Sequence, residues 1–219
     1  MNRSRVLNEV VDYLNSSSSY IMRKYEIIEQ SSIIDDVDIL ISKENEDGLW
    51  EILKKNNFKR KVDSRLFNNY LYGSKPHTHY RSSDHNLHFD VVNRLSHKST
   101  FSIARPGLSL SYWIPLDETI QRDIWLEKET YHYADFNIPI FAPIFELIHL
   151  LCHVIFDKNG EVDHYYTNKI NRLINTVDLD RLKNYLELVF FNFSDELIKL
   201  CSKGSINLLY REYISYRDY

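Results

Sequence analysis

The stretch SIIDDVDILIS, residues 32–42, places three carboxylates within four positions of an apolar segment that is typical of a buried strand. Side chains of a strand alternate between its two faces, so we expect Asp36 and Asp38 to share one face, about 7 Å apart along the chain. Two unpaired carboxylates near a core are costly, because like charge and lost hydration both oppose ionisation. A Mg²⁺ ion would remove this cost, since it prefers hard oxygen ligands.

A second apolar segment, LHFDVV at residues 87–92, contains the lone carboxylate Asp90. If this segment forms a neighbouring strand, Asp90 supplies a third oxygen ligand, and His88 lies on the same face two residues earlier. Other interpretations stay open at this point. Residues 35–38 could instead form a capped turn between two short strands, and Asp90 could pair with Arg23 or Arg94.

The composition is that of a globular protein with a sizeable core. The chain has 219 residues, of which 43% are hydrophobic and 26% charged, and its formal net charge is −4. Its basic residues are scattered, so the sequence carries no electrostatic signature of duplex nucleic-acid binding. A nucleotide or another small molecule is the expected partner.

The N-terminal stretch of the sequence and its two cysteines favour a cytoplasmic location. The N-terminal stretch MNRSRVLNEVVDYLNSSSSY lacks a long apolar core, so we expect neither a signal peptide nor a membrane span. Cys152 and Cys201 lie far apart in apolar, helical patterns, as is typical of buried thiols in a reducing compartment. We therefore expect a cytoplasmic protein.

The hydrophobic periodicity predicts an α+β protein in two parts. Residues 1–115 combine strand patterns with helical patterns at residues 4–15 and 46–58, and we expect a polar loop at residues 73–86. From residue 116 to residue 219 the apolar spacing is helical, apart from an irregular, proline-containing segment near residues 139–145. The prediction is a mixed β-sheet flanked by helices, followed by a C-terminal helical bundle.

The chain resembles the nucleotidyltransferase superfamily with the polymerase-β-like fold, and within it certain bacterial nucleotidyltransferase-like proteins, some of them linked to surface polysaccharide loci. The resemblance runs from about residue 5 to residue 175. It is carried by YIMRKYE (20–26), DDVDILIS (35–42), LHFDVVNR (87–94) and FELIHLLCHVIFDK (145–158). It implies that Asp36 and Asp38 are the metal-binding pair, that Asp90 is the third metal-binding carboxylate, and that all three are catalytic.

One family feature is absent from this sequence. Members of the superfamily hold the triphosphate with a Gly-Ser turn after the first strand, but the corresponding segment here, RKYEIIEQSS at residues 23–32, contains no glycine. We expect the guanidinium of Arg23 and the hydroxyl of Ser31 or Ser32 to bind phosphate instead, with His88 as a further nucleotide contact.

The resemblance implies a transferase that uses Mg²⁺ or Mn²⁺. It would move a nucleotidyl group from an NTP to a hydroxyl or phosphate of a small-molecule or glycan acceptor and release pyrophosphate. Two alternatives stay open. The chain could be a noncatalytic binding or regulatory module with the same fold, or a metal-dependent hydrolase that uses its histidines.

The hydrolase alternative rests on the helix FELIHLLCHVIF, which places His149 and His153 on one face. A zinc site there would need another ligand, for which His77, His79, His85 and His88 are candidates. The competing interpretation is that these two are core histidines bonded to the backbone or to a buried carboxylate.

Overall fold

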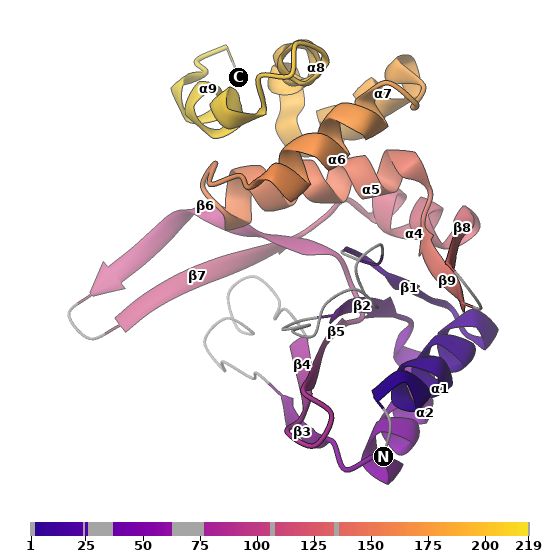
Figure 1. Ribbon diagram of the computed structural model, residues 1–219. Coiled ribbons are helices and arrows are strands. Elements are labelled where there is room, and N and C mark those ends of the chain that lie inside the picture. The colour runs from indigo at the N-terminus through magenta and orange to yellow at the C-terminus, as the bar shows by residue number, and fades with distance from the viewer. Residues whose placement is uncertain are drawn as a thin grey trace. The chain divides into compact units, whose positions relative to one another are not determined.

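The computed structural model describes residues 3–23, 25, 37–62, 77–105, 108–133 and 136–218, and divides the chain into two compact units (Figure 1). The first unit comprises Met1–Leu95 and Trp125–Phe141, and the second comprises Ser96–Ile124 and Ala142–Tyr219. Each unit is thus built from two separate segments of sequence. The expected division into an α/β domain at residues 1–115 and a helical domain at residues 116–219 stays a prediction.

The first unit is built around a mixed, five-stranded sheet in the order β1-β2-β5-β4-β3. Strands β2 and β5 pair in parallel, whereas the β1–β2, β5–β4 and β4–β3 pairs are antiparallel. The elements in chain order are α1 (Arg3–Ser16), β1 (Ser19–Ile21), β2 (Val37–Ile41), α2 (Lys43–Lys55), β3 (Lys59–Val62), β4 (His77–Ser82) and β5 (Leu87–Val92).

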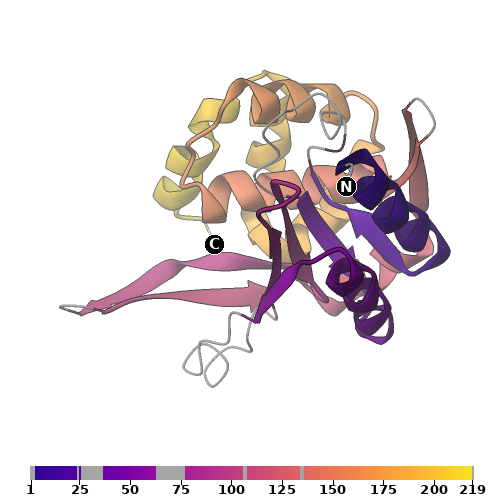
Figure 2. The same ribbon diagram turned by 60° about the horizontal axis from the view of Figure 1, so that its bottom comes forward.

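Helices α1 and α2 lie side by side and bury one face of this sheet (Figures 1 and 2). The residues of β2 and β5 that enter this core follow the period of two expected for a strand, while Leu40 and Val92 are buried on the opposite face. Burial of each such side chain contributes roughly 1.5–3 kcal/mol. The core members from the two strands are Val37, Ile39, Ile41, Leu87, Phe89 and Val91, and those from α1 include Val6, Val10 and Leu14.

The first unit also contains a hairpin where we expected irregular chain. Strands β8 (Lys128–Tyr133) and β9 (Phe136–Phe141) pair antiparallel, and Ile138 and Ile140 join the core. Pro139 suggested a break because it lacks an N–H group, yet proline is tolerated in a strand at a sheet edge. Here Pro139 lies opposite Thr130 in a two-stranded sheet, where an edge position is available.

The polar loop expected at residues 73–86 is in part a strand. Residues 77–82 form β4, and a turn at residues 83–86 connects β4 to β5; residues 73–76 lie outside the described part. Tyr80 faces the helices, with its ring 5.6 Å from that of Trp50 on α2 and its hydroxyl 3.1 Å from Glu46 Oε1. His79 and Arg81 alternate with the buried residues Thr78, Tyr80 and Ser82. Because the buried residues are polar too, the whole segment looks like a loop.

The second unit combines a long hairpin with helices. Strands β6 (Ser96–Arg105) and β7 (Leu108–Pro115) form a ribbon that the sequence did not reveal, and most of α4 (Glu118–Leu126) follows. The C-terminal part is helical, as predicted: α5 (Pro143–Cys152), the π-helical stretch η2 (His153–Asp157), α6 (His164–Ile174), α7 (Leu179–Phe190), η3 (Phe191–Phe193), α8 (Ser194–Ser202), η4 (Ile206–Leu208) and α9 (Leu209–Ser215).

Local sequence explains where two of these helices begin. The Asp163 side chain accepts a hydrogen bond from the backbone N–H of Tyr166, and Asp178 accepts bonds from the N–H groups of Asp180 and Arg181. Such caps satisfy donors that have no partner within the helix. Pro143 is the first residue of α5, a position where its missing N–H costs nothing.

The interior of the second unit contains both thiols and an ion pair. Cys152 and Cys201 are buried and reduced, as predicted, and burial raises the pKa of both, that of Cys201 to about 12. Lys169 Nζ lies 2.9 Å from Glu146 Oε1, and both side chains are less than 5% exposed. None of the helices in the described part of the chain is long and apolar enough to span a membrane.

Candidate functional site

A polar patch lies on the face of the sheet that α1 and α2 do not cover. Asp38 stands between the core residues Val37 and Ile39, and Asp90 stands between Phe89 and Val91. Because neighbours along a strand point to opposite faces, both carboxylates point away from the helical core. His88 shares this face, since it lies two residues before Asp90.

The parallel pairing of β2 with β5 brings the two carboxylates together. Asp38 and Asp90 are direct partners in the strand register. Neighbouring strands lie about 4.8 Å apart, so two acidic side chains stand side by side on one face. Two like charges at this spacing require nearby positive charge, because each otherwise disfavours the ionised form of the other.

Arg23 supplies positive charge to the first carboxylate. Its Nη2 atom lies 2.6 Å and its Nε atom 3.1 Å from Asp38 Oδ2, and both side chains are about 15% exposed. The backbone explains the position of Arg23. The N–H of Met22, the residue after β1, donates to the carbonyl oxygen of Asp38, so Arg23 lies next to Asp38. Arg23 thus balances the charge of Asp38.

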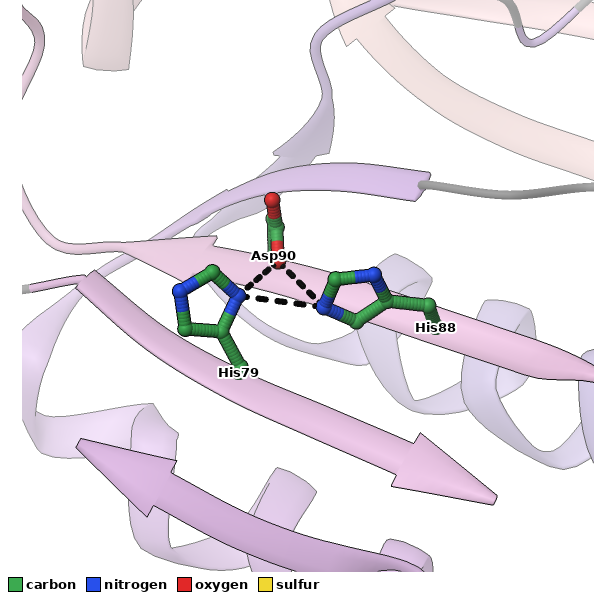
Figure 3. A group of neighbouring side chains, drawn as sticks. All are labelled: His79, His88 and Asp90. Atoms are coloured by element: carbon green, nitrogen blue, oxygen red, sulfur yellow. Dashed lines mark hydrogen bonds and ion pairs between the residues drawn. The ribbon is translucent and has the colours of Figure 1, made fainter. Parts of the chain in front are cut away.

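Two histidines surround the second carboxylate (Figure 3). His79 of β4 is the register partner of Asp90, and its Nδ1 atom lies 2.5 Å from Asp90 Oδ1. The Nε2 atom of His88 lies 2.7 Å from the same oxygen and 3.1 Å from His79 Nδ1. Arg81, also on this face, donates from Nε to His88 Nε2 at 3.2 Å. The face thus gathers carboxylates, imidazoles and guanidinium groups.

Four of the predicted site residues lie in this patch. The structure brings Arg23 to Asp38 and His88 to Asp90, and it aligns the two carboxylates. Asp36, Ser31 and Ser32 lie outside the described residues. Arg23, which we expected to bind phosphate, is paired with the carboxylate of Asp38.

The sequence did not single out two residues of the patch. His79 was considered only as an extra ligand for the helix histidines, and Arg81 was not considered. The alternation in HTHYRS, in which Thr78, Tyr80 and Ser82 are buried, is the signal that would have placed both on the polar face.

The helix histidines of the second unit do not form the zinc site considered above within the described residues. His153 Nδ1 lies 2.9 Å from Asp157 Oδ2, and His153 Nε2 lies 3.1 Å from the Tyr166 hydroxyl. His153 is therefore a core histidine bonded to a carboxylate. Among the described residues, the group that offers three ligand atoms within 4.8 Å of one another is His79, His88 and Asp90.

Comparisons with known proteins identify no family. No protein-family model matches the chain, and no curated protein matches its sequence. Among solved structures, the chain is similar to one described as "Crystal structure of putative nucleotidyltransferase from H. pylori", with 12% sequence identity over 99% of this chain and 97% of the other. The TM-score of 0.34 is too low to show a shared fold.

Proposed function

We propose that the chain is a metal-dependent nucleotidyltransferase. It would transfer a nucleotidyl group from an NTP to a hydroxyl or phosphate of a small-molecule or glycan acceptor and release pyrophosphate. The observation that carries this proposal is the alignment of Asp38 with Asp90 on parallel strands, on the sheet face that α1 and α2 leave uncovered. The NTP requirement and the class of acceptor come from the sequence resemblance.

The donor set fits hard divalent ions. Asp38 and Asp90 present carboxylate oxygens, the ligands that Mg²⁺ and Mn²⁺ prefer, and Asp36 is assigned to the same set. When bound, such ions lower the pKa of an attacking hydroxyl and neutralise charge on the phosphates. Asp90 is also assigned the role of general base for the acceptor, because it would lie beside the acceptor hydroxyl.

The positive groups around the carboxylates fit a triphosphate. Arg23 is held at the edge of the patch by Asp38, and its fork of N–H groups can bind phosphate oxygens in a bidentate manner. We assign it a change of partner, from Asp38 to phosphate, when the nucleotide binds. Ser31, Ser32 and His88 are assigned the remaining nucleotide contacts.

A thermal-shift panel of the four NTPs, each with and without Mg²⁺ or Mn²⁺, tests the proposal without knowledge of the acceptor. A ligand at ten times its Kd stabilises the folded chain by about 1.4 kcal/mol. For a chain of this size that energy corresponds to a rise of about 3–6 °C in melting temperature. We expect one NTP to produce such a rise, and only when the metal is present.

The control for this panel is a pair of matched substitutions. The double variant Asp36→Asn, Asp38→Asn should lose the response, whereas Asp84→Asn, in the exposed turn between β4 and β5, should keep it. If no NTP produces a shift, the proposal fails and a noncatalytic module is the better assignment. An unchanged response of the double variant would instead place nucleotide binding elsewhere.

A further inference from the structure

We infer that His79, His88 and Asp90 form a site for a divalent transition-metal ion, held by two imidazole nitrogens and one carboxylate oxygen. The site shares Asp90 and His88 with the proposed nucleotidyltransferase site. Binding of the ion does not depend on the proposed function. A role of the ion in nucleotidyl transfer does depend on it. Zn²⁺, Co²⁺ and Mn²⁺ are the expected ions, in preference to Mg²⁺.

The first support is the spacing of the three ligand atoms. They lie 2.5, 2.7 and 3.1 Å from one another. Around an ion with bonds of about 2.1 Å, neighbouring ligands stand about 3.0 Å apart in an octahedral site and about 3.4 Å apart in a tetrahedral one. The contact between the two nitrogens already has the octahedral spacing, and the two contacts to the carboxylate need to open by only a few tenths of an ångström.

The second support is that His88 and Asp90 require positive charge beside them. A guanidinium N–H can only donate, so the lone pair of His88 Nε2 accepts the hydrogen bond from Arg81. That same nitrogen lies 2.7 Å from Asp90 Oδ1, which is also an acceptor. The Arg81 guanidinium and the N–H of His79 supply the positive charge here. An ion bound to His88 Nε2 would replace the Arg81 bond and supply that charge instead, because the neutral ring nitrogen has one lone pair.

The third support is that the backbone fixes the arrangement. All three residues lie on strands, His79 and Asp90 are register partners, and His88 precedes Asp90 by two residues on the same face. Ligands on paired strands keep their separation better than ligands on loops. Their side chains are 13–18% exposed, so they are shielded from bulk water and yet reachable by an ion.

The ligand types decide the class of metal. Imidazole nitrogen suits Zn²⁺ and other first-row transition metals, whereas Mg²⁺ takes oxygen ligands and gives up its water reluctantly. Three protein ligands also leave coordination positions open, as in catalytic rather than structural sites. A phosphate oxygen or a water molecule could take an open position.

Titration of the metal-free 219-residue chain with Co²⁺, followed by calorimetry and by visible absorption, tests the inference. Co²⁺ should bind at one site per chain, and Mg²⁺ should not displace it. His79→Gln and His88→Gln should each weaken Co²⁺ binding by about 100-fold or more, because loss of even an outer partner of a metal ligand commonly costs about 10- to 100-fold. His132→Gln is the matched control, since His132 is exposed and bonded only to Asn137 in the hydrogen bonds described for its ring.

A measurement on the unsubstituted chain keeps the test valid if a variant does not fold. Zn²⁺, which is diamagnetic, should shift the ring NMR signals of two of the nine histidines, those of His79 and His88, more than the others. Absence of Co²⁺ binding, or equal binding by the His79 and His132 variants, would show that the group is only a hydrogen-bonded cluster. The two proposals also fail separately: Co²⁺ binding without any NTP response overturns nucleotidyl transfer alone, and an NTP response with Mg²⁺ but no histidine-dependent Co²⁺ binding overturns this inference alone.

Discussion

Replacement of Arg23 by glutamine is predicted to destabilise the metal-free chain and to make its stability depend on Mg²⁺. The guanidinium lies 2.6 Å from Asp38 Oδ2, and Asp38 stands beside Asp90 in the sheet. Without Arg23, Asp38 loses the guanidinium beside it and still has Asp90 as its neighbour in the sheet. A divalent cation can then replace the lost charge.

The expected loss of stability follows from the geometry of the pair. At 2.6 Å and an effective dielectric constant of about 20, the attraction is about 6 kcal/mol before the cost of dehydration. Dehydration of two side chains that are about 15% exposed cancels more than half of this attraction. We therefore expect Arg23→Gln to lower the free energy of unfolding by about 2–3 kcal/mol. The melting temperature should fall by about 4–12 °C.

Urea and thermal unfolding with EDTA, and then with Mg²⁺, would measure both effects. Mg²⁺ should restore a large part of the lost stability in Arg23→Gln and add less to the wild type. Arg60→Gln is the matched control, because Arg60 pairs with Glu46 at 3.1 Å on the helical side of the sheet and is 32% exposed. An Arg23→Gln chain that melts like the wild type, or equal effects of Mg²⁺ on all three chains, would refute the reasoning.

Two further predictions concern the second unit. His97 is buried, and its ring stacks 4.0 Å from that of Phe156. Burial lowers the pKa of His97. The unfolded chain therefore binds a proton at this residue near pH 6.5, whereas the folded chain binds it only at lower pH. The free energy of unfolding should therefore fall as the pH drops below 6.5. Urea unfolding at pH 7.5 and 5.5 should show a smaller fall in His97→Gln than in the wild type. An equal fall in both chains would assign the effect to other groups. Glu146→Gln should cost about 3–5 kcal/mol, because it leaves the buried ammonium of Lys169 without its carboxylate. The double variant Glu146→Gln, Lys169→Met should regain much of that loss in the same assay, and a double variant no more stable than the single one would contradict this account.

The strands that carry the carboxylates could be predicted because their two faces differ in character. In β2 and β5 the residues that face the helices are aliphatic or aromatic, so the alternation fixed which side chains share a face. The pairing of Asp38 with Asp90 required only the assumption that the two strands are neighbours. That assumption is confirmed by the parallel register.

The rest of the patch could not be predicted, because its signals are weak or non-local. Strand β4 has polar residues on both faces, and its buried Thr78 and Ser82 look like loop residues. Strand β9 was missed because Pro139, which lacks an N–H group, suggested a break in the chain. The pairing of Arg23 with Asp38 depends on how β1 ends beside β2, which no local pattern encodes.

The division of the first unit into two sequence segments affects how the protein can fold during synthesis. Strand β9 packs against α1 and β1, and the Asn15 side chain donates to the carbonyl group of Asn137. A ribosome moves from residue 95 to residue 141 in about 2–9 s. Until then, the nascent first unit lacks Ile138 and Ile140 of its core, so part of its apolar surface stays open to chaperones.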